Sequence, residues 1–341
     1  MNSFYIAFFT ALVVSFVLTP IARKLAFKVG ALDIPKDERR VHTEPMPYLG
    51  GLAIYVSTIA CLAIFVPLNK TNICIMIGGT IIVLIGLLDD MKDVSPKVKL
   101  AAQILASAIA VYGGVRIHFI TNPLAATGIS YLQNLVIPIT IFWIVGITNT
   151  INLIDGLDGL ASGVAAIAAT TLLFASALKG YTFIIPLYAI IAGASLGFLP
   201  FNFNPAKIFM GDTGALFLGY MLAVTSILGM MKSVAVVALA IPIFALGLPI
   251  FDTTFAIFRR LVNKKPIMEA DKEHLHHRLL EKGLSQRQTV LILYFISMIL
   301  GVTAVFIADA EPDTGTIVIG IVTAAVLYSA SKMGLLGKKQ N

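Results

Sequence analysis

The fold is decided by the stretch LQNLVIPITIFWIVGITNTINLIDGLDGLASGVAAIAATTLLFASAL, residues 132–178, in which two long apolar runs flank a short polar segment. The runs over 132–148 and 160–178 each approach the length of about 20 residues that a helix needs to cross a bilayer. The segment between them, NTINLIDGLDGLA (149–161), holds two asparagines, two aspartates and two glycines. Carboxylates at the margin of an apolar layer are costly, so these two indicate a functional site where the spans meet.

Composition extends this interpretation to the whole chain. The 341 residues are 58% hydrophobic and 13% charged with a mean hydropathy of +0.91, whereas soluble domains are about 45–50% apolar and about 25% charged. In lipid, only helices and closed barrels pair all the backbone N–H and C=O groups in hydrogen bonds, and long apolar runs favour helices over barrels. We predict an all-α, polytopic membrane protein, a single domain over 1–341, with about eleven spans: 4–22, 49–67, 72–88, 100–115, 132–148, 160–178, 183–199, 213–230, 234–258, 288–308 and 315–331.

Positive charge predicts the orientation, because Lys and Arg accumulate in the cytosolic loops of membrane proteins. If the N-terminus is outside and the C-terminus is cytosolic, 21 of the 25 basic residues lie on the cytosolic side. The cytosolic loops then cover about 23–48, 89–99, 149–160, 200–212 and 259–287. We expect the active site to be built from these loops.

Acidic residues gather on the same side. Of the 18 acidic residues, only Asp309, Glu311 and Asp313 fall on the predicted outer face. Three separate cytosolic loops place carboxylates at the edge of the apolar layer: Asp89 and Asp90, Asp155 and Asp158, and Asp212. Any one of them could simply cap a helix or end a loop, but three loops that converge on one face favour a binding site.

Clustered carboxylates need a counter-charge, because like charges raise one another's pKa and disfavour ionisation. A divalent cation would supply it. Oxygen ligands suit Mg²⁺ or Mn²⁺, and Mg²⁺ commonly binds through one or two carboxylates together with substrate phosphates. The acidic cluster therefore predicts a phosphate-bearing substrate.

A histidine-rich segment, EADKEHLHHRLLEKG (269–283), lies in the largest cytosolic loop. On a helix, His274 and His277 share a face, Arg278 joins them, and His276 lies to the side. Zinc is an alternative, but the adjacent His276 and His277 cannot easily turn to one metal. We interpret the histidines as donors to a phosphoryl group or a sugar; a solvated basic loop is the other reading.

Two further cytosolic features are charged. The first loop adds Arg40 and His42 in the stretch DIPKDERRVHTEP, which could bind a phosphate or only acidic lipid headgroups. Asp252 lies seven residues before Arg259, about 10 Å deeper along a helix, so it needs a partner. The adjacent Thr253 and Thr254 are the candidates.

Four motifs in order resemble those of the polyprenyl-phosphate N-acetylhexosamine-1-phosphate transferases, glycosyltransferase family 4. They are DDMKD (89–93), NTINLIDGLDGLA (149–161), FNFNPAKIFMGDTG (201–214) and HLHHR (274–278). The resemblance covers essentially the whole chain, including the order of its spans. It implies an integral membrane enzyme that transfers a sugar 1-phosphate from a UDP-sugar to undecaprenyl phosphate, releases UMP and starts a cell-envelope glycan.

The resemblance also implies roles for individual residues. It makes Asp212 the Mg²⁺ ligand, supported by Asp89 and Asp90, and Mn²⁺ could substitute for Mg²⁺. Whether Asp89 or Asp90 also acts as a general base stays open. The resemblance places Asn152 and Asp155 near the catalytic centre, and Lys99 would neutralise charge there. The uridine pocket would be formed by Gly156, Leu157, Asp158, Asn202 and Phe209. The diphosphate or the sugar would be bound by His274, His276, His277 and Arg278.

The form of the histidine motif bears on the sugar. HLHHR after EADKE resembles the UDP-N-acetylglucosamine branch, which initiates teichoic acid, O-antigen or enterobacterial common antigen. The alternative is phospho-N-acetylmuramoyl-pentapeptide transfer in peptidoglycan synthesis, whose branch typically has three consecutive histidines; here Leu275 interrupts them. We expect an enzyme of the bacterial cytoplasmic membrane whose active site faces the cytosol. Its expected partners are UDP-N-acetylglucosamine, undecaprenyl phosphate and the lipid bilayer. A second copy of the chain could form a homodimer with it, and we expect no binding to nucleic acid.

Two other classes are less compatible with the sequence. A CDP-alcohol phosphotransferase needs an Arg shortly after the Asp-Gly and further aspartates in the next helix, which DGLDGLASGVAAIAA lacks. An ion-coupled transporter should place its coupling acids near the bilayer midplane, and only Asp252 fits that even partly.

Overall fold

The computed structural model describes residues 3–33, 45–121, 129–230, 239–264 and 274–332, and these residues are almost all helical. The helices are α1 Ser3–Val29, α2 Gly50–Phe65, α3 Lys70–Lys92, α4 Pro96–Tyr112, α5 Val136–Leu153, α6 Leu160–Leu178, α7 Ile185–Asn202, α8 Gly211–Met230, α9 Ala240–Ala245, α10 Gly247–Val262, α11 Leu275–Glu281, α12 Gln286–Asp309 and α13 Pro312–Lys332. Two small antiparallel ribbons pair β1 Leu32–Asp33 with β2 Met46–Pro47 and β3 Phe119–Thr121 with β4 Ile129–Tyr131.

The helices confirm an all-α, multi-pass membrane protein. Eight of those described have at least 18 residues and enough apolar character to cross a bilayer, and α2 is a shorter apolar helix of 16 residues. Ten of the eleven predicted spans coincide with one helix each. The total of eleven crossings stays a prediction.

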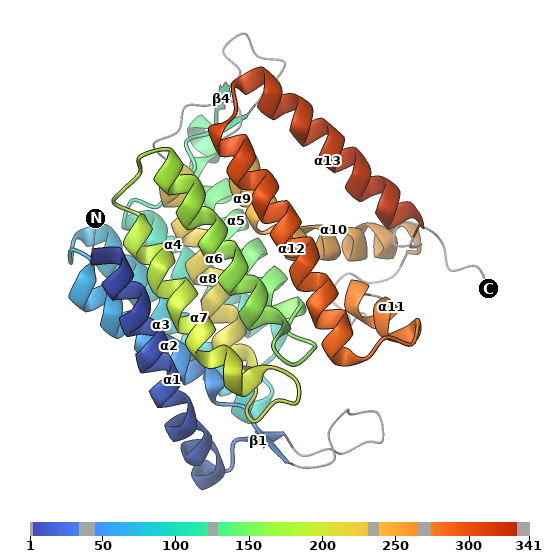
Figure 1. The fold of residues 1–341 in the computed structure, drawn as a ribbon. Coiled ribbons are helices and arrows are strands. Elements are labelled where there is room, and N and C mark those ends of the chain that lie inside the picture. The colour runs from blue at the N-terminus through green and yellow to red at the C-terminus, as the bar shows by residue number, and fades with distance from the viewer. Residues whose placement is uncertain (1–2, 34–44, 122–128, 231–238, 265–273, 333–341) are drawn as a thin grey trace.

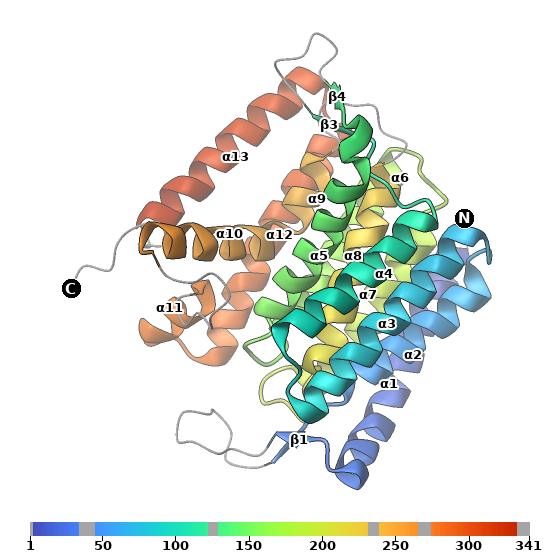
Figure 2. The ribbon, with the colours of Figure 1, turned by 180° about the vertical axis from the view of Figure 1, so that it is seen from behind.

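The ninth predicted span, 234–258, differs from the expectation of one continuous helix. Its described part is two helices, α9 and α10, separated at Leu246. Pro249 has no N–H to donate to the carbonyl of Ala245, so an α-helix cannot continue through this point with its hydrogen bonds intact. After the break, α10 runs across the direction of α12 in both views (Figures 1 and 2).

The core is built around α8. In an 18-residue window of α8, 89% of the residues are buried inside the protein, against 11% in the corresponding window of the peripheral α13. α8 packs mainly on α3 and α5, with α2 and α6 also in contact. Small residues allow this close packing: a Cβ on Gly219 would lie 2.8 Å from the Cα of Thr148 on α5.

Most connections that carry the predicted site lie at one end of the bundle. The α3–α4, α5–α6 and α7–α8 connections gather there with β1 and α11, whereas β3, β4 and the α12–α13 connection lie at the opposite end (Figures 1 and 2). The three carboxylate-bearing loops therefore share one face, as predicted. That this face is cytosolic stays a prediction.

The orientation can be tested by labelling engineered cysteines in whole cells. We expect a membrane-impermeant thiol reagent to label Asp313→Cys from outside and to label Lys282→Cys only after the membrane is opened. Both positions are exposed, Asp313 in the first turn of α13 and Lys282 directly after α11, and these helix ends lie at opposite ends of the bundle. The native Cys61 and Cys74 are buried and would be replaced by alanine as background. The reverse labelling pattern would contradict the predicted orientation.

Candidate active site

A cavity of about 450 Å³ opens at the end of the bundle where the three loops meet. Ten of its lining residues are ones predicted from the sequence: Asp89, Asp90, Asn152, Asp155, Gly156, Leu157, Asp158, Asn202, Phe209 and Asp212. Six were not predicted: Asp33, Tyr48, Asp93, Met210, Gly211 and Gln286. The structure thus brings five separate parts of the chain into one polar cavity: the β1–β2 region, the end of α3, the α5–α6 turn, the α7–α8 connection and the start of α12.

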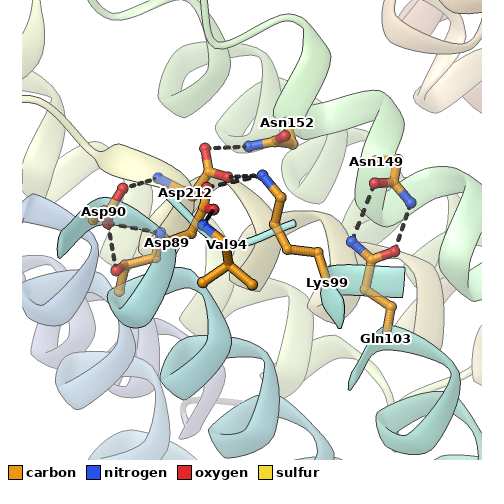
Figure 3. Close-up of polar contacts among 9 residues, drawn as sticks. Asp89, Asp90, Val94, Lys99, Gln103, Asn149, Asn152 and Asp212 are labelled. Carbon is orange, nitrogen blue, oxygen red and sulfur yellow. Dashed lines mark hydrogen bonds and ion pairs between the residues drawn. The ribbon is translucent and has the colours of Figure 1, made fainter. Parts of the chain in front are cut away.

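Lys99 joins the carboxylates of two helices at this cavity. Its Nζ lies 2.8 Å from Oδ2 of Asp89 on α3 and 3.0 Å from Oδ2 of Asp212 on α8 (Figure 3). Asn152 on α5 donates to the other oxygen of Asp212 at 3.0 Å, and the backbone N–H of Val94 donates to Asp89 at 2.7 Å. Lys99 itself is on α4, so this network ties four helices together at the site.

Asp90 has a different environment, because it caps the N-terminus of α8. Its carboxylate accepts from the backbone N–H groups of Asp212 and Thr213, at 2.8 and 3.1 Å, and from the Thr213 hydroxyl at 2.6 Å. Free N–H groups at a helix start favour such an anionic partner. Gly211 makes the approach feasible: its φ is +69°, and a Cβ there would lie 2.5 Å from Oδ2 of Asp90. A role for Asp90 in metal binding or as a base stays a prediction.

Asp155 lies in the turn between α5 and α6 and is surrounded by negative charge. Burial, as the largest cause, and then the nearby carboxylates of Asp212, Asp90 and Asp158 together raise the pKa of Asp155 to about 8. The three carboxylates contribute to this shift because like charges close together disfavour ionisation. The described part of the chain has no group of three His, Cys, Asp or Glu side chains that could enclose a metal ion by itself.

Two residues predicted for the uridine pocket, Asp158 and Asn202, form hydrogen bonds that hold the loops around the cavity in place. Oδ2 of Asp158 accepts from the Asn204 amide at 3.0 Å and from the backbone N–H of Ala206 at 3.1 Å. Asn202 is 2% exposed; it accepts from the Ser162 hydroxyl at 2.9 Å and donates to the Ile208 carbonyl at 3.1 Å. These bonds fasten the α7–α8 connection to α6 and to the α5–α6 turn, so they shape the cavity wall.

Asn204 and Gln286 were missed by the sequence analysis. The Asn204 amide also donates to Oε1 of Gln286 at 2.9 Å, which links the start of α12 to the cavity. Asn204 stands inside the NFNPAK motif, so its polarity was a signal. Nothing in the local sequence of Gln286 distinguishes it, since its partner is 82 residues away.

The histidine motif packs against the cavity wall without lining the cavity itself. His276 is 3% exposed, and its Nε2 packs against the cavity-lining Gly156, where a Cβ would lie 2.8 Å away. Burial lowers the pKa of His276 to about 4, with a smaller contribution from His277, so the ring is neutral near pH 7. His274, His277 and Arg278 are described but do not line the cavity, and Arg40 and His42 lie outside the described residues.

The partner of Asp252 is not the one expected from the sequence. Instead of Thr253 or Thr254, its carboxylate contacts Nδ1 of His274 and the backbone N–H of Leu275, each at 2.8 Å. The threonine prediction was wrong because the segment 274–275 folds back onto α10, which local sequence does not reveal.

Comparison with known proteins agrees with this geometry. The family described as "Glycosyl transferase family 4" matches residues 72–230, which include the α3–α4, α5–α6 and α7–α8 loops of the cavity. A Bacillus subtilis protein named probable undecaprenyl-phosphate N-acetylglucosaminyl 1-phosphate transferase is 42% identical over 98% of this chain and 93% of its own length. The chain belongs to glycosyl transferase family 4.

Other relatives within the family carry different names. The decaprenyl-phosphate N-acetylglucosaminephosphotransferase of Mycolicibacterium smegmatis is 34% identical over 92% of this chain and 84% of its own length. The phospho-N-acetylmuramoyl-pentapeptide-transferase of Staphylococcus aureus strain MSSA476 is 32% identical over 87% of this chain and 97% of its own length. Both sugar branches considered from the sequence are therefore represented among the family 4 relatives.

The capping contact of Asp90 can be separated from chemistry by thermal unfolding in detergent. We expect Asp90→Ala to lower the stability by about 1–3 kcal/mol, seen as a Tm several degrees lower, because it leaves buried donors at the start of α8 without an acceptor. Asp212→Asn keeps the size of the side chain and the Lys99–Asp89 ion pair while removing the repulsion between the two carboxylates, and it is expected to leave the Tm within about 2 °C. An unchanged Tm for Asp90→Ala would contradict the capping role.

Proposed function

We propose that this family 4 protein transfers N-acetylglucosamine 1-phosphate from UDP-N-acetylglucosamine to undecaprenyl phosphate, releasing UMP. The observation that carries the proposal is the convergence of Asp89, Asn152 and Asp212 in a polar cavity at the end of an apolar bundle, with Lys99 bonded to both carboxylates. A lipid phosphate needs access from the bilayer and a nucleotide needs access from water. A cavity at this level meets both needs.

The reaction joins two anions, so its main requirements are neutralised charge and in-line placement. An oxygen of the acceptor phosphate forms a bond to the sugar-bearing phosphorus of the donor. The bond from that phosphorus to the bridging oxygen breaks, and UMP leaves with the bridging oxygen. A phosphate monoester is already largely ionised near neutral pH, so the attack needs no separate base. Lys99 is placed to offset charge at Asp89 and Asp212.

The carboxylates around the cavity suit Mg²⁺, with Mn²⁺ as a substitute. Mg²⁺ binds through one or two carboxylates and completes its shell with water and substrate phosphates, so it does not require the cluster of three acidic, His or Cys ligands that the described residues lack. Asp212 would hold the ion with support from Asp89. When bound, Mg²⁺ would neutralise the donor diphosphate and the developing charge on UMP.

The remaining cavity residues fit the donor. Gly156, Leu157, Asp158 and Phe209 all line the cavity, and in this proposal they hold the uracil ring by stacking and polar contact at its edge. His276 lies behind Gly156 and would act on the sugar phosphate together with His277 and Arg278. In this proposal the cavity faces the cytosol of a bacterial cell, and the lipid-linked product starts a glycan such as teichoic acid or O-antigen. A homodimer stays a prediction.

The second candidate is transfer of phospho-N-acetylmuramoyl-pentapeptide. It is supported by the Staphylococcus aureus relative, whereas the interrupted HLHHR motif and the higher identity to the Bacillus subtilis relative favour N-acetylglucosamine. An ion-coupled transporter has no comparable support, because the cavity carboxylates lie at one end of the bundle and the chain belongs to a transferase family.

The donor is decided by UMP release from purified protein with undecaprenyl phosphate and either nucleotide sugar. We expect UMP with UDP-N-acetylglucosamine and none above background with UDP-N-acetylmuramoyl-pentapeptide. EDTA is expected to abolish release and added Mg²⁺ to restore it. Release with the pentapeptide donor alone would overturn the choice of sugar, and release unaffected by EDTA would overturn the role of the metal.

The role of Lys99 is tested by Lys99→Met, with Lys99→Arg as the charge-preserving control. We expect Lys99→Met to lower kcat by about 100-fold or more, because two carboxylates lose their nearby positive charge, on the scale of a lost electrostatic catalytic group. Lys99→Arg should retain more activity than Lys99→Met. Equal activity of the two variants would show that the charge at this position does not matter.

A further inference from the structure

Asp252 holds the start of α11 from a different helix. It lies on α10 and is 6% exposed. One carboxylate oxygen lies 2.8 Å from Nδ1 of His274, and the other accepts from the backbone N–H of Leu275 at 2.8 Å. His274 is the N-cap residue of α11 and makes no side-chain cap of its own. Asp252 therefore supplies the cap from 22 residues away along the chain.

The contact continues from His274 to His276. Their imidazole rings are stacked, with centroids 5.8 Å apart and planes 2° from parallel. Nε2 of His276 is buried without a hydrogen-bond partner in the described part of the chain. Buried polar atoms are normally hydrogen-bonded, so an orphaned nitrogen needs an explanation. The nitrogen packs against Gly156, which lines the cavity, so it lies directly beside the cavity wall.

The geometry of Asp252 fixes more than a helix start. An ionised carboxylate only accepts hydrogen bonds, so Nδ1 of His274 carries the proton in this contact. The carboxylate thus sets both the tautomer and the orientation of the His274 ring. Since that ring stacks on His276, a change at Asp252 would alter the placement of Nε2 beside Gly156.

We propose that Asp252 is a positioning residue for sugar 1-phosphate transfer: through His274 and the start of α11 it holds Nε2 of His276 at the cavity wall formed by Gly156. The proposal rests on the proposed function. Asp252 itself contacts no substrate in this account, because it does not line the cavity. Its effect on catalysis passes through His276.

Steady-state UMP release by purified protein tests the role of Asp252. Asp252→Asn keeps an acceptor for the Leu275 N–H but replaces the acceptor at His274 with an amide. We expect its kcat to fall about 10–100-fold, since small displacements of a reacting group cost this much, with the KM for undecaprenyl phosphate within about twofold. Thr253→Ala is the matched control on the same helix; its buried hydroxyl has no hydrogen-bond partner among described residues, and we expect activity within about twofold.

A second substitution separates positioning from a general loss of structure. In a His276→Ala background, Asp252→Asn is expected to cause no further loss beyond about twofold, because residues that act through one group are not additive. If Asp252→Asn lowers kcat as much in the His276→Ala background as in the wild-type background, the proposal is overturned. It is also overturned if Asp252→Asn alone keeps the wild-type kcat, or if that variant does not fold. No UMP release by the wild-type protein would instead overturn the proposed function.

Discussion

The ion pairs of Lys99 with Asp89 and Asp212 are the interaction on which the site depends. Each carboxylate ends or begins a long apolar helix, where an unpaired charge would be costly. A shared lysine makes their proximity tolerable and fixes α3, α4 and α8 relative to one another at one end of the bundle. One lysine does not balance all the carboxylates at the cavity, which is why we propose a cation there together with a phosphate-bearing substrate.

The apolar part of the fold serves this arrangement. α8 is enclosed by its neighbours along almost its whole length, and its N-terminus opens at the cavity. The free N–H groups and positive end of that helix favour anions, and Asp90 already occupies part of this position. The non-helical turn at 154–159 is tolerated at this depth because it lines a polar cavity rather than lipid.

Much of the fold and part of the site were predictable from the sequence. Apolar run length located the helices, and the convergence of acidic loops predicted the cavity, because both depend on local composition. The break at Leu246 was missed although Pro249 signalled it. The contact of Asp252 with His274 and the capping of α8 by Asp90 could not be predicted, because each joins segments far apart in the chain, the second across 122 residues.

The central claim is that Lys99 and Asp212 act as one electrostatic unit in the transfer step. A double-mutant cycle on kcat/KM for UMP release, with Lys99→Met, Asp212→Asn and both together, tests it most directly. We predict that the double variant is about as slow as the slower single variant, because either change alone disables the unit. Losses that multiply across the two single variants would show that the residues act independently and would contradict the account.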